Sequence, residues 1–259
     1  MKLGFIGTGA ISDAMIRGLL TTDYPIDHVI VSRRGDRFSA KLAADFANVQ
    51  IEDDNQAIID QADMIFLAVL PQIANDVLSS LTVPKGKKVV SLIATIPIDD
   101  LKNWLNSDAQ FDRAIPLPAV EHHACVTAVS PGSDDVMALF EKLGGAVAAK
   151  TIDAFDGYAT GSALMATYFT MLESSAQWMV AHGSDYADAR RYLAALFGGL
   201  SENTLKSPDQ SFAALVDGHS TPGGLNEQVA KTFEREQGCV AIHTALDEVF
   251  ARFNAAATS

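Results

Sequence analysis

Cysteine and long apolar runs are scarce in this sequence, and each shortage excludes a class of protein. Only two of the 259 residues are cysteines, Cys125 and Cys239, which is too few for a disulfide framework or a cysteine-ligated zinc site. We therefore expect idle or buried thiols and no bound metal. No apolar run is long enough to span a bilayer, and no basic leader with an apolar stretch precedes the first expected strand. These absences predict a cytoplasmic protein without membrane contact.

Positive charge is also in short supply. Nineteen Lys and Arg residues stand against 32 Asp and Glu, so the formal net charge is −13. A nucleic-acid backbone or an anionic membrane surface attracts Lys and Arg, so neither is an expected partner. Apolar residues make up 48% of the chain, which is an ordinary globular composition, and the length suits one or two domains.

The strongest pattern is the stretch from Leu3 to Leu20. A short apolar run reaches Gly7 and Gly9, and an amphipathic segment follows, which predicts a strand, a tight turn and a helix. The turn is a G-x-G-x-x-G pattern with Ser12 in the third place, where a small residue lets helix and strand pack. We therefore expect a dinucleotide pyrophosphate to bind Gly7, Thr8, Gly9, Ala10, Ile11 and Ser12. The alternative is a glycine turn in some other α/β domain.

The end of the second expected strand indicates which dinucleotide binds. An acidic residue there would accept a hydrogen bond from a ribose 2′-hydroxyl, but the sequence has Ser32, Arg33 and Arg34. Hydroxyl and guanidinium groups suit a 2′-phosphate, so Ser32 and Arg33 predict NADPH as the cofactor, with NADH as the second choice. The alternative is a solvated loop that happens to carry two arginines.

Strands and helices alternate as far as residue 149, which predicts a doubly wound, Rossmann-type sheet. Strands are expected at residues 3–6, 28–31, 49–51, 64–70, 88–93, 112–115, 125–129 and 147–149, with helices between most of them. We expect Asn55 to cap the helix at residues 56–62. The loop at residues 116–123 contains His122 and His123, which we expect to be solvated or packed rather than metal ligands.

The character of the sequence changes near Thr151. The remaining residues show helical patterns and no convincing strand, so we expect domains at 1–150 and 151–259. Tyr158 to His182 is predominantly apolar, with Glu173 as its one charge. A helix that is apolar on most faces must be buried, which predicts a homodimer or a higher oligomer. The last residues, Ala255 to Ser259, are expected to fray.

Four segments resemble the pyrroline-5-carboxylate reductase family. That family has a GFIGxGxM-type opening, a VKPQ turn, an MPNTP loop and an SPGGTT segment. The corresponding segments here are GFIGTGAI near the N-terminus, Val69-Leu70-Pro71-Gln72, Ile115-Pro116-Leu117-Pro118, and the segment from Thr221 to Asn226. They occur in the family's order over nearly the whole chain.

The resemblance implies an NADP-binding domain, a helical dimerisation domain and reduction of a cyclic imine, with 1-pyrroline-5-carboxylate as the first candidate. It places Asn55 near the adenine ribose. Ala68, Val69, Leu70, Pro71, Ile93 and Ala94 would line the nicotinamide side. Thr221 would be the catalytic-site hydroxyl, and the substrate carboxylate would bind Ser220, Thr221, Gly223, Gly224, Leu225 and Asn226. His219, just before this segment, could add to anion binding or supply a proton.

The departures from the family fall mostly on the substrate side. Leu70 replaces the lysine of the VKPQ turn, Leu117-Pro118 replaces Asn-Thr, and Leu225-Asn226 replaces Thr-Thr. They leave two other readings open: a reductase of a different cyclic imine or of a small keto or hydroxy acid, and a non-catalytic NADP-binding regulator. The β-hydroxyacid dehydrogenases share the two-domain plan, but Lys206 is a poor match for their lysine.

Overall fold

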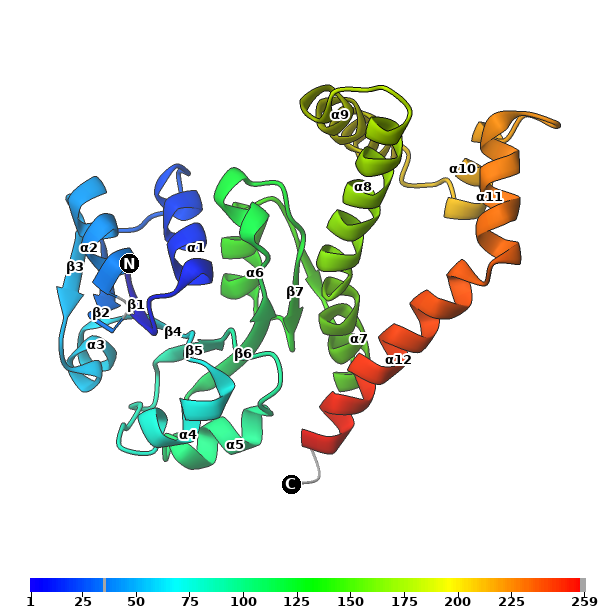
Figure 1. Ribbon diagram of the computed structural model, residues 1–259. Coiled ribbons are helices and arrows are strands. Elements are labelled where there is room, and N and C mark those ends of the chain that lie inside the picture. Colours follow the sequence, from blue (N-terminus) through cyan, green and yellow to red (C-terminus); the bar gives the residue numbers. More distant parts are fainter. Residues whose placement is uncertain (35, 257–259) are drawn as a thin grey trace. The chain divides into compact units, whose positions relative to one another are not determined.

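The computed structural model describes residues 1–34 and 36–256. Contacts within the chain divide it into two compact units, Met1–Thr160 with the C-terminal residues from Phe250, and Gly161–Val249. We call them the sheet unit and the helical unit (Figure 1). The last helix continues to Ala256, so fraying at Ala255 and Ala256 is not seen, and the rest of that expectation lies outside the described residues.

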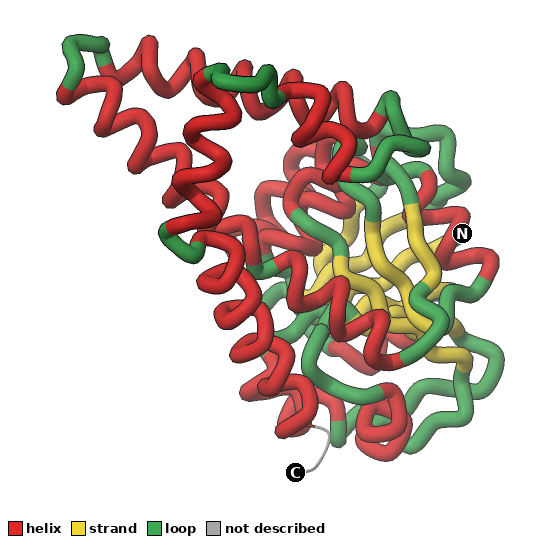
Figure 2. Tube along the Cα trace, turned by 90° about the vertical axis from the view of Figure 1, so that its right-hand side faces the viewer, coloured by secondary structure: helices red, strands yellow, loops and turns green. Residues whose placement is uncertain are grey.

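The sheet unit is built on one sheet of eight strands in the order β3-β2-β1-β4-β5-β6-β7-β8. Figure 2 draws the strands of this sheet in yellow. The chain runs outward from β1 in one direction and then from β4 in the other, which is the doubly wound arrangement predicted from the sequence. The strands are β1 (Lys2–Ile6), β2 (His28–Ser32), β3 (Val49–Glu52), β4 (Met64–Leu67), β5 (Lys88–Ser91), β6 (Gln110–Ile115), β7 (Thr127–Ser130) and β8 (Ala146–Ala148).

Helices cover both faces of this sheet, and each face has its own apolar core. Helices α1, α2 and α6 contribute to the core on one face, and α3, α4 and α5 to the core on the other. The elements are α1 (Ala10–Leu20), α2 (Asp36–Asp45), α3 (Asn55–Gln61), α4 (Pro71–Leu78), α5 (Ile98–Trp104), the 3₁₀ helix η1 (Pro118–His122), α6 (Asp134–Glu141) and α7 (Ile152–Ser162). Covered on both faces, the central strands are continuous apolar runs.

Strand β4 illustrates that pattern. All four of its residues are buried, and Phe66 stacks on Phe5 of β1 with ring centroids 4.6 Å apart. The strand ends at Leu67, three residues earlier than expected. Leu70 is instead the N-cap of α4, and Pro71 is the first residue of that helix, where a proline is favourable because its missing N–H is not needed.

Strand β7 departs from the parallel pattern. It pairs antiparallel to β6, with Ala114 opposite Val129, whereas the other neighbouring pairs are parallel. A parallel return needs a long crossover, usually a helix, and the segment between β6 and β7 supplies only η1 and loops. Strand β8, which follows α6, is parallel to β7 again.

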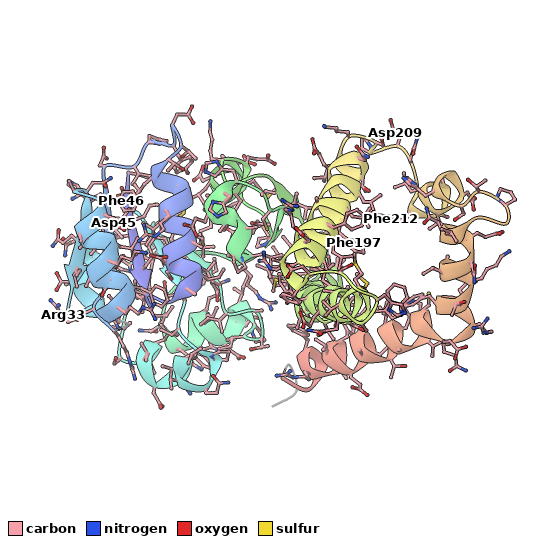
Figure 3. The ribbon with its side chains drawn as sticks, turned by 45° about the horizontal axis from the view of Figure 1, so that its top comes forward. Arg33, Asp45, Phe46, Phe197, Asp209 and Phe212 are labelled. Carbon is pink, nitrogen blue, oxygen red and sulfur yellow. The ribbon has the colours of Figure 1, made fainter. Side chains whose placement is uncertain are left out.

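The helical unit has a very small core. Among the described residues its buried side chains form one cluster, Ala176, Ala189 and Leu193. Large apolar side chains are exposed instead, among them Trp178, Phe169 and Phe212, and Figure 3 labels Phe212 and Phe197. The helices are α8 (Leu164–Ala181), α9 (Tyr186–Leu205), α10 (Phe212–His219), α11 (Leu225–Arg235) and α12 (Gly238–Ala256), of which the last belongs to this unit only as far as Val249.

The stretch from Tyr158 to His182 is not one helix, as its composition suggested. Helix α7 ends at Ser162 and α8 begins at Leu164, and the break follows the small residues Gly161 and Ser162. Glycine weakens a helix interior, which explains the interruption. None of the helices in residues 1–34 and 36–256 has the length and apolar character needed to cross a bilayer.

Candidate functional site

The glycine turn joins β1 to α1 in the predicted way. Gly7 has a φ of 98°, which favours glycine, and a Cβ there would lie 2.5 Å from the carbonyl oxygen of Ala68. Gly9 is different, because its backbone is extended and a Cβ would meet nothing within 4 Å. Gly7 is therefore required by the fold of the chain itself, and Gly9 leaves open space beside the backbone.

The hydroxyl groups of Thr8, Ser12 and Ser32 stabilise this turn through hydrogen bonds to its backbone or to the end of β2. The Gly7 N–H donates to Ser32 Oγ at 2.9 Å, Thr8 Oγ1 donates to the Ser32 carbonyl at 2.7 Å, and Ser12 Oγ donates to the Gly7 carbonyl at 2.8 Å. All three side chains are buried. Ser12 therefore fits the place of the third glycine, and the hydroxyl of Ser32 supports the turn rather than pointing outward for a phosphate.

The start of α1 is free to receive an anion. Its N-cap is Gly9, which has no side chain, and within residues 1–34 and 36–256 no side-chain cap of this helix is found. The first amides of a helix have no intrahelical acceptor, and the helix dipole makes them attractive to phosphate. Ala10, Ile11 and Ser12 supply these amides at the carboxyl end of β1.

Arg33 lies directly after β2, as the sequence suggested, and it has an acidic neighbour. Its guanidinium forms an ion pair with Asp53, which follows β3, and both side chains are more than half exposed. Figure 3 labels Arg33. A 2′-phosphate that binds Arg33 would have to compete with the carboxylate of Asp53. The sequence interpretation treated the arginines alone and missed this pair, although Glu52-Asp53-Asp54 is an acidic run at the end of a neighbouring strand.

Asn55 is not a helix cap. Asp54 is the N-cap of α3, and its carboxylate accepts from the Gln56 N–H at 2.9 Å. Asn55 is the first residue of the helix, at the same edge of the sheet as the ends of β1 and β2. The capping prediction is therefore wrong by one residue, because Asp and Asn are equally good caps.

The segments expected on the nicotinamide side follow β4 and β5. Ala68 continues the ladder through its N–H, which donates to the Ile6 carbonyl at 2.8 Å, and Leu70 is 68% exposed. Ile93 is buried, and its N–H donates to Ser91 Oγ at 3.2 Å. The ends of β4 and β5 lie side by side in the register, so the structure brings these segments to one edge of the sheet.

The segment expected to bind the substrate carboxylate lies in the helical unit, between α10 and α11. Gly223 has a φ of 74°, the Gly224 N–H donates to the Thr221 carbonyl at 2.7 Å, and Gly224 is the N-cap of α11. The predicted turn and helix start are therefore present. Ser220 is half-buried, and Thr221, Leu225 and Asn226 are exposed.

The donors of this turn are partly occupied. The Gly223 N–H donates to the carboxylate of Glu227 at 2.8 Å, and the Asn226 side-chain amide donates to the His219 carbonyl at 3.0 Å. Lys231 pairs with Glu227 at 2.7 Å. The hydrogen bond from Lys231, and then that from Gly223, lower the pKa of the Glu227 carboxyl, so it is ionised at neutral pH. An acid that the sequence interpretation missed thus lies at the predicted anion site.

The histidines show no metal arrangement. His122 ends η1 and His123 follows it in the left-handed region, so the pair is not in a strand, and the ring of His123 lies 2.9 Å from the Gly18 carbonyl. The His219 ring contacts the Leu215 carbonyl of its own helix at 2.7 Å. In the described part of the chain no group of three His, Cys, Asp or Glu side chains could hold a metal ion.

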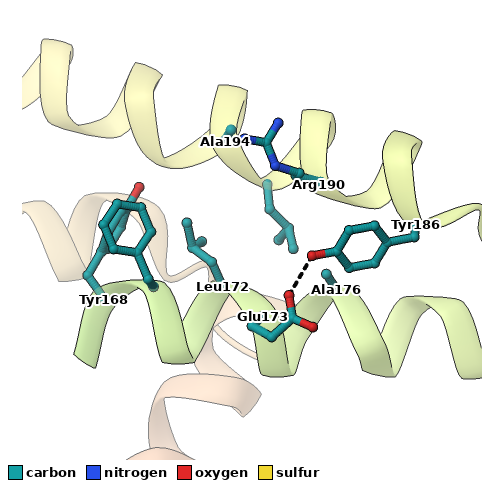
Figure 4. Close-up of a pocket in the computed structure, with 9 residues that line it drawn as sticks. Tyr168, Leu172, Glu173, Ala176, Tyr186, Arg190 and Ala194 are labelled. Carbon is teal, nitrogen blue, oxygen red and sulfur yellow. Dashed lines mark hydrogen bonds between the residues drawn. The ribbon is translucent and has the colours of Figure 1, made fainter. Parts of the chain in front are cut away.

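A cavity of 350 Å³ between α8 and α9 contains none of the predicted site residues (Figure 4). The Tyr186 hydroxyl donates to Glu173 at 2.6 Å, the Gln177 amide donates to the same carboxylate at 2.8 Å, and Arg190 also lines the cavity. Tyr168, Phe169 and Leu172 give it an apolar wall. It is a feature of the helical unit alone.

Known proteins match both parts of the chain. Residues 2–95 match the family model described as NADP oxidoreductase coenzyme F420-dependent, and residues 150–255 match the model for pyrroline-5-carboxylate reductase dimerisation. The pyrroline-5-carboxylate reductase of Escherichia coli is 27% identical over 256 residues, which cover 95% of this chain and 94% of that protein.

Solved structures share the fold. The 1-pyrroline-5-carboxylate reductase of Streptococcus pyogenes superposes with a TM-score of 0.85 at 23% identity, covering 98% of each chain. The Plasmodium falciparum pyrroline carboxylate reductase with NADP bound gives a TM-score of 0.82 at 18% identity, over 99% of this chain and 98% of that one.

The doubly wound sheet, the helical region after it and the matches to known proteins place this chain among the NAD(P)H-dependent oxidoreductases. Within that class the chain is similar to the pyrroline-5-carboxylate reductases, both in its dimerisation region and over nearly its whole length. The resemblance of the four short segments is therefore confirmed.

Proposed function

We propose that this protein reduces the C=N bond of a cyclic imine with NADPH, and that 1-pyrroline-5-carboxylate, giving L-proline, is the first substrate to test. The open start of α1 behind Gly7 and Gly9 carries the proposal for the cofactor, since it offers unoccupied amides to a pyrophosphate. The relatives named for this substrate support the choice of imine. NADH is the second choice of cofactor.

The chain's own residues mainly bind and orient. NADPH, when bound, supplies the hydride that reduces the imine carbon. In this proposal the amides of residues 7–12 hold the pyrophosphate, Arg33 the 2′-phosphate, and Asn55 the ribose. Residues 68–71 and 93–94 shape the nicotinamide side and exclude water from it. Orientation of two bound molecules supplies much of the rate in such a reaction, so no catalytic dyad is required.

The turn before α11 is the proposed substrate site. Thr221 would supply a hydroxyl donor, and the amides of Leu225 and Asn226 would supply backbone donors. The Asn226 side chain already bonds the His219 carbonyl, so it contributes less than the sequence suggested. Domains at 1–150 and 151–259 remain part of the proposal, with the second domain serving substrate binding and dimerisation.

A cyclic imine without a carboxylate is the second candidate substrate. Glu227 favours it, because its carboxylate already accepts from the Gly223 N–H at the turn proposed to receive the substrate's own carboxylate. Two like charges at one site repel each other, so an uncharged ring would bind there at lower cost. The apolar replacement Leu70 on the cofactor side agrees with a less polar substrate.

Turnover with a substrate panel tests the proposal. Purified protein is mixed with NADPH and, separately, 1-pyrroline-5-carboxylate, 1-pyrroline, a small keto acid and a buffer blank, and the loss of NADPH absorbance is followed. Oxidation with either imine supports the proposal, and the ratio of the two kcat/KM values chooses between the candidates. Turnover of the keto acid alone would contradict it. NADPH binding without turnover of any compound would indicate a non-catalytic regulator.

We also propose a homodimer built through the helices that follow Thr151. The exposed apolar side chains of the helical unit support it, since monomers rarely leave large apolar patches in water. An obligate interface of this kind should bury upward of about 2,000 Å². Light scattering of the purified protein should give twice the chain mass or a multiple of it, and a stable monomer at micromolar concentration would contradict the proposal.

A further inference from the structure

Arg113 is a buried arginine in the middle of β6. Its side chain is only 8% exposed, although arginine is rarely buried without a partner. The preceding residue, Asp112, serves the other face of the strand, where it accepts from the Gly132 N–H and the Ser133 N–H, both at 2.9 Å. Successive side chains of β6 point to opposite faces of the sheet. Asp112 therefore holds the loop after β7 on one face, and Arg113 makes its contacts on the other.

The guanidinium of Arg113 joins three elements of the sheet unit. Its Nη2 donates to the carbonyl of Ala94, just after β5, and lies 3.5 Å from Asp156 Oδ1 of α7. Its central carbon lies 4.3 Å from the centre of the Phe155 ring. Asp156 and Phe155 thus fix the guanidinium from one side, and the guanidinium fixes the backbone of the turn after β5.

Burying this ion pair costs desolvation free energy. Burial lowers the pKa of Arg113, with Asp156 acting against that shift, and burial raises the pKa of Asp156, with Arg113 acting against it. Among the described residues Arg113 Nε has no hydrogen-bond partner. An apolar residue would cost less folding free energy at such a position.

The turn that Arg113 holds is anchored in the apolar core by Ile93 and Ile96, and it also borders a pocket. A pocket of 550 Å³ is lined by Thr95, Pro97 and Ile98 of this turn, and by Arg113 and Asp156 on its other side. Ala94 stands between the buried Ile93 and Ile96 in the sequence, and the hydrogen bond from Arg113 to its carbonyl is a further contact that sets the position of the turn.

That position matters because of where β5 lies. In a doubly wound dinucleotide fold the ligand binds outside the carboxyl ends of the strands, with its two halves on either side of the switch point. The open glycine turn follows β1, on the adenosine side, so the nicotinamide half falls at the ends of β4 and β5. Ala94 lies just beyond the end of β5.

We propose that Arg113 is a positioning residue for the nicotinamide half of the cofactor. It holds the carbonyl of Ala94, and through it the turn after β5, while Asp156 and Phe155 hold Arg113. The adenosine half is bound by other elements and does not depend on this contact. The inference rests on the proposed cofactor site and goes beyond it by assigning a role to a residue that touches neither cofactor nor substrate.

Binding of a whole cofactor and of its adenosine half tests this role. The dissociation constants of NADPH and of adenosine 2′,5′-bisphosphate are measured by calorimetry for wild type, Arg113→Lys and Arg113→Met, together with each variant's melting temperature. Lysine keeps the charge but lacks the planar guanidinium that lies over the Phe155 ring. Both variants should weaken NADPH about tenfold, the loss expected for one charge-assisted hydrogen bond, and should change the bisphosphate less than about twofold.

Arg17 provides a matched control. It is also a largely buried arginine of the sheet unit, paired with Asp45 at 2.8 Å, lying over the Phe46 ring, and carrying one nitrogen without a partner among the described residues. Figure 3 labels Asp45 and Phe46. Arg17→Lys should lower the melting temperature without separating the two dissociation constants, because this arginine lies toward the far end of α1.

The outcomes support or contradict the positioning role of Arg113 as follows. If the Arg113 variants weaken both ligands equally, the residue serves the domain as a whole and the inference is wrong. If neither ligand is affected, it is wrong as well. If Arg113→Met does not fold, the result for Arg113→Lys stands alone. Failure of wild type to bind NADPH would instead overturn the proposed function.

Discussion

Two glycine turns begin helices in this protein, and they differ in what fills them. The turn before α1 has no side chain on its first amides, and a Cβ at Gly9 would meet nothing within 4 Å. The turn before α11 carries the carboxylate of Glu227 on the Gly223 N–H, with Lys231 beside it. The turn before α1 is thus open to an anion, whereas one amide of the turn before α11 is already taken by a carboxylate of the same helix.

The two turns differ in the same way as the two binding events proposed for them, cofactor binding before α1 and substrate binding before α11. In the proposed function, cofactor binding would depend on backbone geometry, which the chain maintains with buried hydroxyls at Thr8, Ser12 and Ser32. Substrate binding would depend on side chains around α11, where the chain has exposed Leu225 and a charged Glu227. A chain can therefore keep the same cofactor turn while its substrate end changes.

The largest expected effect comes from the turn before α1. Gly7→Ala would place a methyl group 2.5 Å from the Ala68 carbonyl at a φ of 98°. The backbone strain alone should cost about 1–3 kcal/mol, so the melting temperature should fall and NADPH binding should be lost. Circular dichroism melts and calorimetry measure the two effects.

Gly9→Val is the matched variant, since its side chain has space in the free protein. It should melt like wild type but weaken NADPH by about a hundredfold, because the side chain occupies the approach of the pyrophosphate. If Gly9→Val binds NADPH as tightly as wild type, the pyrophosphate does not bind at the turn before α1, and the proposed difference between the two turns is wrong.

The turn before α11 should respond to charge. Glu227→Gln removes the negative charge that competes with a substrate carboxylate, so KM for 1-pyrroline-5-carboxylate should fall about tenfold while KM for 1-pyrroline changes little. Glu202→Gln is the control, because Glu202 forms the same i,i+4 pair with Lys206 on α9. Equal effects of both variants on the two imines would mean that Glu227 does not face the substrate.

The ion pair between Arg33 and Asp53 should limit the preference for NADPH. Wild type should bind NADPH more tightly than NADH. Asp53→Asn should strengthen NADPH several-fold and leave NADH nearly unchanged, and Arg33→Asp should remove the preference, by about 1.5–3 kcal/mol for a charge-assisted contact. Asp60→Asn, on the exposed surface of α3, is the control. Wild-type affinities that are equal for both cofactors would contradict the assignment of the 2′-phosphate to Arg33.

The smallest effect concerns pH. Lys231 and the Gly223 N–H hold the pKa of Glu227 below the ordinary value of 4.5. An acid with a lowered pKa stabilises the folded state above its unfolded pKa, and this contribution is lost as the pH falls through the lower, folded value. The amide chemical shift of Gly223 in NMR spectra should therefore titrate with a midpoint below 4.5, and Lys231→Met should raise it. A midpoint that Lys231→Met leaves unchanged would show that the pair does not form in solution.

The parts of the molecule that sequence predicted best are those in which a local rule decides. The Gly7 turn needs a positive φ, and the runs at β1 and β4 need burial on both faces, so the pattern is sufficient. The site residues of the sheet unit follow from strand ends, which the register aligns without further information. Their roles toward a cofactor remain predictions.

The misses share a different cause. The direction of β7 and the break before Leu164 depend on neighbours that a local pattern does not contain. Asp53 and Arg113 act through residues far away in the sequence, Arg33 and Asp156. The contact of Glu227 could have been predicted from the sequence. An acid three residues after a helix N-cap is a known capping arrangement, and Glu227 stands three residues after Gly224.

The small core of the helical unit, with Ala176, Ala189 and Leu193 as its buried side chains among the described residues, has a thermodynamic consequence. If a second chain covers the exposed apolar helices, folding of that unit and association of two chains are one equilibrium. By mass action the apparent stability then depends on the concentration of the protein, so dilution alone would lower the melting temperature. In a cell, the abundance of this protein would protect each copy from proteolysis.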